Sequence, residues 1–140
     1  MKISARVENS LNAHRVTVAT NGKDQAIEIP SRESGWGSSA NGGELLFLAL
    51  ATCYCNDIYR EAANRGITVE RVEVEVDGEF GAPGEPGTHL TYRARVVANA
   101  SRAEIEELMR HTDTVAEIQN TLRTPTTVTL AGIEAVVAGT

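Results

Sequence analysis

The sequence predicts an α+β fold in which an antiparallel sheet packs against a long, buried central helix. Apolar and polar residues alternate in the first third of the chain and again between residues 70 and 98, a pattern typical of half-buried strands. Between these stretches, residues 44–65 contain no Gly or Pro and form the predicted helix. The strands come in neighbouring pairs, which excludes a doubly wound parallel sheet. The length of 140 residues suits one domain, residues 1–140.

Three strands are expected before the helix. The turn residues Asn21 and Gly22 tolerate the positive φ angles of a tight type I′ turn, so residues 15–29 are predicted to form a hairpin. A strand around residues 3–7 precedes it. The apolar residues that alternate in these strands are Ile3, Ala5, Val7, Val16, Val18, Ile27 and Ile29.

A loop rich in Gly and Ser, residues 31–43, leads into the long helix. No lysine follows its glycines and the phosphate-binding pattern GxxxxGK[ST] is absent, so a nucleotide site is not expected. Asn41 or Ser39 is the expected cap of the helix, and Gly66 is placed to end it. Residues 45–51 are apolar on every side, which predicts that this part of the helix is buried all round.

A second hairpin is expected after the helix. Val72, Val74 and Val76 alternate with glutamates, and a similar alternation over residues 90–96 follows the turn-forming sequence GAPGEPG. The outward residues of the two strands have opposite charges. We therefore expect cross-strand ion pairs between the arginines and the glutamates, which are Arg93, Arg95, Glu73 and Glu75.

The last third of the chain is predicted to hold two short helices and a strand. Capping-box patterns begin at Ser101 and at Thr114. They predict one helix over residues 102–111 and a second, short helix that starts at the Thr114 box and ends at about Leu122. The closing residues 126–138 again have a strand pattern.

Composition limits the partners. The formal net charge is −6 at pH 7, which argues against nucleic acid and against anionic lipid as partners. The longest apolar run, residues 45–51, is far shorter than the roughly 18 residues that indicate a membrane span. The N-terminal residues have no apolar stretch of the signal-peptide kind, so the cytoplasm is the expected location. In that reducing compartment two cysteines are not expected to form a structural disulfide.

The two cysteines, Cys53 and Cys55, lie on the predicted long helix. Residues two apart on a helix point about 200° away from each other, so these thiols are not expected to form a disulfide. Cys53 shares its face with Asn56 and Asp57, whereas the face of Cys55 is more apolar. Cys53 is therefore the better candidate for a reactive thiol, although these residues alone favour a structural role for both cysteines.

The three histidines do not indicate a metal centre. Structural zinc takes four Cys or His ligands in close spacing, and two cysteines on one helix with scattered His14 and His89 do not supply them, so neither a metal nor another cofactor is expected. His111 and Asp113 have the residue types of a general-base pair for a cysteine hydrolase. The end of a helix is the stronger explanation for both residues, because a histidine in the last turn is favoured by the helix dipole and an aspartate just outside a helix is typical of a cap.

The segment NGGELLFLALATCYCNDIYREAANRGI, residues 41–67, resembles the signature helix of the OsmC/Ohr family, and the order of elements matches along essentially the whole chain. The resemblance, to the OsmC-like branch, implies an intertwined homodimer with the long helices buried between subunits. It also implies a stress-response, antioxidant oxidoreductase, a thiol peroxidase acting on organic hydroperoxides. Cys53 would be the peroxidatic thiol, and Glu44 and an arginine would assist it. Arg15 is the preferred candidate for this assisting arginine because it leads a strand, and Arg6 and Arg32 are the alternatives.

The chain departs from the family pattern at three positions. Ala116 stands where the family has its second cysteine, so the usual two-cysteine cycle, which a lipoyl-type dithiol resets, cannot run. Glu44 has the spacing to Cys53 of OsmC-like members, whereas the Ohr branch has its glutamate at the place of Gly43. Cys55 is an additional thiol where the family often has none.

The residues and the resemblance together give two candidate functions and one further alternative. The first is a one-cysteine peroxidase whose oxidised Cys53 is resolved by an external thiol or dithiol. The second is a protein that binds an apolar small molecule on the same scaffold without catalysis, which the replacement by Ala116 favours. In the third, both cysteines are core residues of a stress-related protein.

Overall fold

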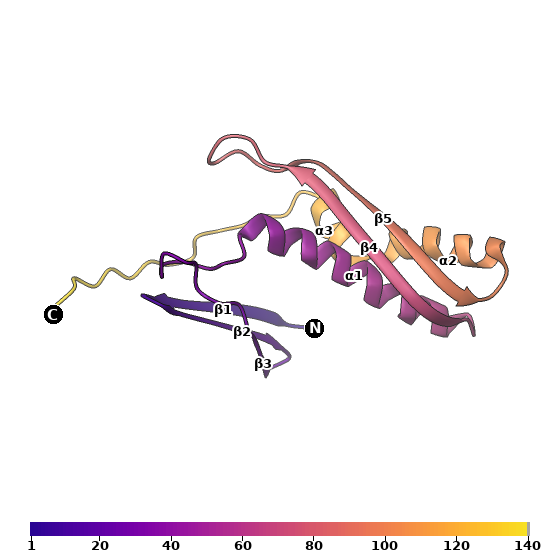
Figure 1. Ribbon diagram of the computed structural model, residues 1–140, viewed down its shortest axis with the longest axis horizontal. Coiled ribbons are helices and arrows are strands. Elements are labelled where there is room, and N and C mark those ends of the chain that lie inside the picture. The colour runs from indigo at the N-terminus through magenta and orange to yellow at the C-terminus, as the bar shows by residue number, and fades with distance from the viewer. Residues whose placement is uncertain (140) are drawn as a thin grey trace. The chain divides into compact units, whose positions relative to one another are not determined.

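The computed structural model describes residues 1–139 and has the element order β1-β2-β3-α1-β4-β5-α2-α3. The chain divides into two compact units. The first contains Met1–Leu48 and Gly78–His89, and the second contains Ala49–Asp77 and the residues from Leu90 onward. Figure 1 shows the three helices and the two antiparallel sheets, and the predicted α+β class is confirmed.

The first unit holds a three-stranded antiparallel sheet of β1 (Ile3–Ser10), β2 (Ala13–Thr20) and β3 (Lys23–Ile27), in the order β1-β2-β3. The predicted hairpin is confirmed. Asn21 and Gly22 have φ angles of 50° and 78°, which is the backbone conformation that a type I′ turn requires.

The long helix α1 (Gly42–Asn64) begins and ends close to the predicted residues. The Asn41 side chain accepts a hydrogen bond from the Glu44 amide, and the Glu44 carboxylate accepts one from the Asn41 amide, which makes a capping box. Gly66 follows the helix with φ of +67°, as expected for a residue that ends a helix. The prediction of all-round burial is wrong for the single chain, because Leu45 is 38% exposed and Leu48 is 59% exposed.

The strands β4 (Thr68–Glu79) and β5 (Thr88–Asn99) form the predicted hairpin, and most of both strands belongs to the second unit. The inward residues of both strands are half-buried and the outward residues are exposed. Arg93 lies 2.9 Å from Glu75, and Arg95 lies 3.9 Å from Glu73, so the expected cross-strand ion pairs are confirmed.

The core of the second unit joins α1 to α2 (Arg102–Val115). Tyr54, Ile58 and Ala62 of α1 pack against Leu108 of α2, and apolar side chains of β4 and β5 cover this cluster. The hydroxyl of Tyr54 donates to the carbonyl of Met109 over 2.8 Å, which satisfies the polar end of a buried ring. The packing of this core fixes the middle of α1 relative to the helices that follow the sheet.

Two predictions for the C-terminal third are wrong. Ser101 caps α2 as expected, but Thr114 lies inside α2 and its hydroxyl donates to the carbonyl of His111. The next helix, α3 (Glu117–Arg123), has Ala116 as its N-cap and has no side-chain cap bond. Thr114 therefore extends α2 instead of starting a new helix.

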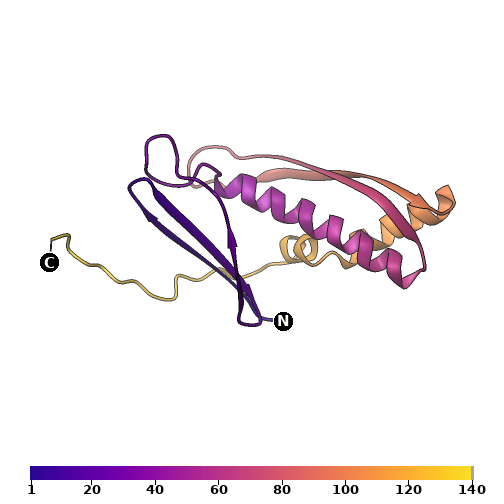
Figure 2. The ribbon, with the colours of Figure 1, turned by 60° about the horizontal axis from the view of Figure 1, so that its bottom comes forward.

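The second wrong prediction is the closing strand. Residues 126–138 form neither a helix nor a strand, and Figure 2 shows their extended course. Their apolar side chains are strongly exposed, since Val128 is 95% exposed and Ile133 is 88% exposed. The strand pattern is present, but a strand needs an edge to pair with, and within the described chain this segment is not part of a sheet.

Within residues 1–139, none of the helices has both the length and the apolar character needed to cross a membrane.

Candidate functional site

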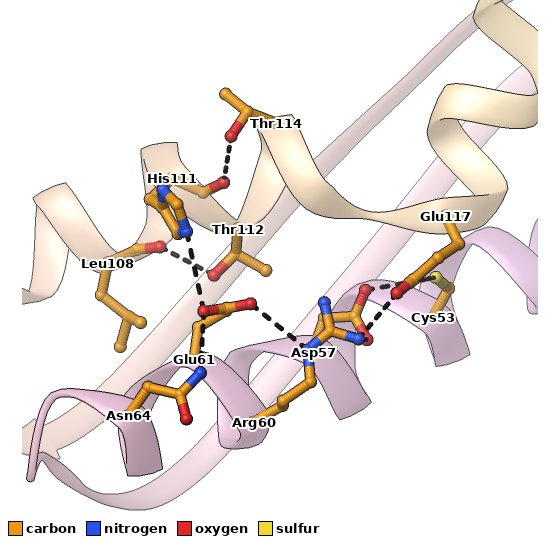
Figure 3. Close-up of polar contacts among 10 residues, drawn as sticks. All are labelled: Cys53, Asp57, Arg60, Glu61, Asn64, Leu108, His111, Thr112, Thr114 and Glu117. Atoms are coloured by element: carbon orange, nitrogen blue, oxygen red, sulfur yellow. Dashed lines mark hydrogen bonds and ion pairs between the residues drawn. The ribbon is translucent and has the colours of Figure 1, made fainter.

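Cys53 lies on α1, half-buried, and its sulfur is held between two carboxylates (Figure 3). Its Sγ lies 3.5 Å from Asp57 Oδ2 and 3.6 Å from Glu117 Oε2, so either carboxylate can accept the single thiol proton in a hydrogen bond. The backbone N–H of Ile118, in the first turn of α3, also points to the sulfur. The three groups come from two helices that are far apart in the sequence.

Local geometry explains why these groups meet. Asp57 follows Cys53 by four residues, so both side chains lie on one face of α1. Glu117 comes from α3, which is attached to α1 by a buried hydrogen bond from Gln119 Nε2 to the carbonyl of Leu50 over 3.0 Å. Because this bond fixes the first turn of α3 against α1, Glu117 is brought beside Cys53.

Arg60 completes the cluster on its solvent side. Its guanidinium nitrogen Nη1 lies 3.0 Å from Asp57 Oδ1 and 2.7 Å from Glu117 Oε1, and Nε lies 3.2 Å from Glu61 Oε1. The Asp57 side chain is only 8% exposed, whereas that of Glu117 is 57% exposed. Arg60 thus supplies the positive charge that a buried aspartate requires.

The two carboxyls that contact Cys53 have pKa values pushed in opposite directions. Burial, followed by the hydrogen bond and the charge of Glu117, raises the pKa of Asp57 to about 6. The hydrogen bond from Asp57 lowers the pKa of Glu117 to about 2, with Arg60 acting in the same direction. The pair therefore shares one proton between pH 2 and pH 6, and Asp57 is the carboxyl that holds it.

Burial raises the pKa of the Cys53 thiol above its ordinary value, and the charge of Asp57 and the hydrogen bonds to both carboxylates act in the same direction. The N–H of Ile118 acts in the opposite sense, because it stabilises the thiolate. None of the arginines in the described part of the chain donates a hydrogen bond to the sulfur. The resting form of Cys53 is therefore the thiol.

The same cluster has the donor types of a metal site. One ligand atom each from Cys53, Asp57 and Glu117 lie within 4.8 Å of one another. The guanidinium of Arg60 already contacts both carboxylates, and it neutralises the charge that would attract a divalent cation. The fold therefore brings three possible metal ligands together, but the positively charged guanidinium of Arg60 lies against two of them.

The other predicted site residues are engaged elsewhere. Glu44 starts α1, nine residues before Cys53, and its carboxylate accepts the cap hydrogen bond from the amide of Asn41. Arg15 lies on β2 with its side chain 77% exposed, and its guanidinium lies 3.4 Å from Glu8 on β1. Both residues belong to the first unit, so their predicted assistance to Cys53 stays a prediction.

The two alternative arginines also have contacts within the first unit. Arg6 lies 3.2 Å from Glu8, and Arg32 Nε donates to the carbonyl of Ser38 over 2.9 Å. A Cβ atom at Gly43 would lie 2.9 Å from the ring of Phe80, so a longer side chain there would displace the ring.

Ala116 is fully buried and stands next to Glu117, whose carboxylate contacts the Cys53 sulfur. Ala116 therefore directly precedes, in the chain, the residue that contacts the Cys53 sulfur. Cys55 is free and half-buried, and it lines a separate small hollow with Ala51, Thr52, Asn56 and Val74. The expectation that the two thiols have different surroundings is confirmed.

The possible hydrolase pair is not assembled around Cys53. His111 Nε2 lies 3.6 Å from Glu61 Oε2, while Asp113 accepts hydrogen bonds from Tyr92 and Arg123. These contacts join α2 to its neighbours, so they have a structural role.

Sequence reasoning missed Arg60 and Glu117. Arg60 could have been found, because it lies seven residues after Cys53 and three after Asp57, which places all three on one side of a helix. Glu117 has no such signal, since only the fold brings the start of α3 to α1.

Comparison with known proteins gives a consistent family. A family model described as OsmC-like protein matches residues 35–131. No match was found among curated proteins. Three similar solved structures have 20% sequence identity or less to this chain, so they show the likeness of the fold.

An OsmC-like protein from Mycoplasma pneumoniae has a TM-score of 0.61 and 17% identity, covering 87% of this chain and 86% of the other. An OsmC-like protein of unknown function from Vibrio cholerae has a TM-score of 0.62 and 17% identity, covering 89% and 95%. An organic hydroperoxide resistance protein from Legionella pneumophila has a TM-score of 0.57 and 20% identity, covering 88% and 90%.

Proposed function

Because the chain belongs to the OsmC-like protein family, we propose that it is a thiol-dependent peroxidase that reduces organic hydroperoxides at Cys53. The observation that carries this proposal is the position of the half-buried Cys53 thiol among ionisable groups from α1 and α3. The description of the similar Legionella pneumophila structure as a hydroperoxide resistance protein supports the same class of substrate. A stress-response role in the cytoplasm follows from this chemistry and agrees with two unpaired cysteines.

The proposed reaction oxidises Cys53 to a sulfenic acid, and an external thiol or dithiol restores it. In this step the thiolate attacks the terminal oxygen of the hydroperoxide and the O–O bond breaks. Ala116 has no sulfur to condense with the sulfenic acid, and Cys55 points to a different side of α1. The resolving thiol must therefore come from another molecule.

Glu44 and Arg15 remain the proposed assistants from the first unit. Their role is tested by Glu44→Gln and Arg15→Met, with Glu8→Gln as the control for loss of the Arg15 ion pair alone. A role in activating Cys53 requires slower peroxide reduction in both variants and an unchanged rate in the control.

A homodimer is the proposed assembly. Its support is apolar surface that the described chain leaves exposed, on Leu48 of α1 and on the extended segment after α3. Such surface is typical of a protein-protein interface. The exposed apolar residues of that segment include Val128, Leu130, Ile133, Val136 and Val137.

A second function has specific support. A thiol whose pKa is raised, and to which no described arginine donates a hydrogen bond, is a weak nucleophile at neutral pH. With Ala116 in place of the second cysteine, these features favour a protein that binds an apolar small molecule without turning it over.

One experiment separates the two functions. Wild type and Cys53→Ser are treated with micromolar cumene hydroperoxide, sulfenic acid is captured with dimedone, and the adduct is located by mass spectrometry. The peroxidase predicts an adduct on Cys53 and turnover when a dithiol is added. Absence of oxidation in the wild type, together with identical behaviour of Cys53→Ser, would leave the binding function.

A further inference from the structure

The cluster around Cys53 contains a carboxylate in the position of a proton acceptor. Asp57 is buried and accepts the hydrogen bond of the Cys53 thiol through Oδ2, while its other oxygen, Oδ1, contacts the guanidinium of Arg60. One oxygen is thus bound to the reacting group and the other is fixed by a cation. This division leaves Oδ2 available to take the thiol proton.

We propose that Asp57 takes the proton of the Cys53 thiol and returns it to the departing alkoxide, with Glu117 and Arg60 acting as positioning residues that hold the Asp57 carboxylate. This inference rests on the peroxidase function proposed above and adds the proton pathway to it. It makes Asp57 a catalytic residue, because Asp57 contacts the reacting sulfur.

The step balances as follows. The thiol proton passes from Cys53 Sγ to Asp57 Oδ2, and the thiolate attacks the terminal oxygen of the hydroperoxide ROOH. The S–O bond forms and the O–O bond breaks, so the sulfur gives up two electrons and the peroxide accepts them. The leaving alkoxide RO⁻ takes the proton from Asp57, which gives the sulfenic acid, the alcohol ROH and a regenerated carboxylate.

The electrostatics of the cluster suit such a proton carrier. An ordinary aspartate is a weak base toward a thiol, but burial and the neighbouring Glu117 raise the pKa of Asp57 to about 6, which brings it closer to that of the thiol. At neutral pH the carboxyl is therefore ionised and still basic enough to accept a proton. Burial keeps the thiol itself protonated at rest, so its proton must move to another group before the sulfur attacks the peroxide.

The charged surroundings of Asp57 come from α1 and α3. Arg60 on its own helix and Glu117 on α3 contact it directly, and Arg60 also contacts Glu61. Glu61 in turn faces His111 of α2 over 3.6 Å. The β4 side chains that cover the neighbouring core are apolar, namely Val69, Val72 and Val74.

The test compares two reactions of the same thiol in a Cys55→Ser background, where Cys53 is the only cysteine. Alkylation by iodoacetamide depends on the thiolate and needs no proton for the leaving iodide. Oxidation by cumene hydroperoxide needs a proton for the leaving alkoxide. Both rates are measured at pH 7 for wild type, Asp57→Asn and the control Asp24→Asn, which removes one exposed carboxylate from β3.

The proposal predicts opposite changes in Asp57→Asn. Alkylation becomes faster, by roughly severalfold, because the loss of a neighbouring negative charge favours the thiolate. Oxidation becomes slower by at least about tenfold, because general acid-base catalysis contributes on the order of 10²–10⁴. Asp57→Glu keeps a carboxylate and is expected to recover part of the oxidation rate, which also tests the idea if the asparagine variant does not fold. Asp24→Asn is expected to change neither rate.

Three results would overturn the proposal. Equal or faster oxidation in Asp57→Asn would mean that the carboxylate only restrains the thiol. Unchanged alkylation in that variant would mean that Asp57 does not hold the Cys53 proton, whatever the peroxide result. A wild type that cumene hydroperoxide does not oxidise would remove the peroxidase function and the delivery step together, while faster alkylation of Asp57→Asn would still show the contact between the two residues.

Discussion

The shared proton of Asp57 and Glu117 gives a prediction that can be measured without any substrate. In the wild type we expect Asp57 to titrate with a pKa of about 6 and Glu117 with a pKa of about 2. The rise for Asp57 starts from an ordinary value of 3.8. It corresponds to about 3 kcal/mol in favour of the protonated carboxyl. Replacing Glu117 by Gln removes the negative charge and exchanges the carboxylate acceptor for a weaker amide oxygen, so both causes that follow burial are reduced.

The assay is a ¹³C NMR titration of side-chain carboxyl carbons in wild type and Glu117→Gln. The pKa of Asp57 is expected to fall in the variant, because the charge of Glu117 no longer adds to burial and the remaining amide oxygen is a weaker acceptor. An Asp57 that titrates near its ordinary value in the wild type would refute the reasoning. So would an Asp57 pKa that stays at about 6 in Glu117→Gln.

The same pKa values set the sign of a pH effect on stability. Between about pH 4 and pH 6 the unfolded chain releases the Asp57 proton while the folded chain keeps it, so the free energy of unfolding falls as the pH rises through this window. Glu117 acts in the opposite sense, since its lowered pKa stabilises the folded chain above about pH 4.5 and this is lost as the pH falls towards 2. The Glu117 contribution is the smaller one because its side chain is 57% exposed. Urea unfolding from pH 3 to pH 8 is expected to show this pair stabilising the fold most near pH 4–5, a maximum that Glu117→Gln weakens.

Three further predictions follow from contacts elsewhere. Ala116→Cys is expected to form a disulfide with Cys53 after peroxide treatment, because the residue after Ala116 contacts the Cys53 sulfur; two thiols that remain free by mass spectrometry would contradict this. Tyr92→Phe removes the hydrogen bond to Asp113 and is expected to cost about 1–3 kcal/mol in urea unfolding, whereas Tyr59→Phe, at a residue 44% exposed, is expected to change little. Leu130→Lys is expected to weaken the proposed homodimer in light scattering, and a monomeric wild type would remove that assembly.

The fold could be predicted where local patterns decide the structure. The Asn21-Gly22 turn, the cap at Asn41 and the glycine after α1 each depend on a few neighbouring residues, and all three are as expected. The alternation in β4 and β5 correctly predicted that the valines face inward and that the outward arginines and glutamates form ion pairs. Such features are local because the backbone conformation and the strand period are set by adjacent residues.

The wrong predictions concern features that depend on contacts with residues far away in the sequence or with another molecule. The pattern of residues 126–138 predicts a strand, yet whether it pairs depends on an available edge. The all-round apolar part of α1 predicts burial, yet Leu48 is 59% exposed in the single chain. Both cases are apolar sequence that the described chain does not cover, and sequence patterns do not say which molecule would cover it.

The residues of the candidate site also fall into two groups, those that helix spacing predicts and those that only the tertiary structure brings together. Asp57 could be placed beside Cys53 because both lie on one helix face, and Arg60 could have been added by the same rule. Glu117 could not, because its position depends on the hydrogen bond from Gln119 that attaches α3 to α1. The residue that sets the protonation of the pair is thus the one that only the tertiary structure reveals.

Position 116 shows how little of the chain separates a two-cysteine cycle from the chemistry proposed here. The contacts of α3 with the Cys53 sulfur come from Glu117 and Ile118, the two residues that follow position 116. With Ala116 in that place, oxidised Cys53 has no internal partner, and the nearest polar groups are carboxylates that accept hydrogen bonds but supply no electrons. The lifetime of a sulfenic acid here would then depend on the approach of an external thiol past the exposed Glu117 and Arg60. A scaffold can therefore keep its helices and change its catalytic cycle through one buried methyl group and the charges beside it.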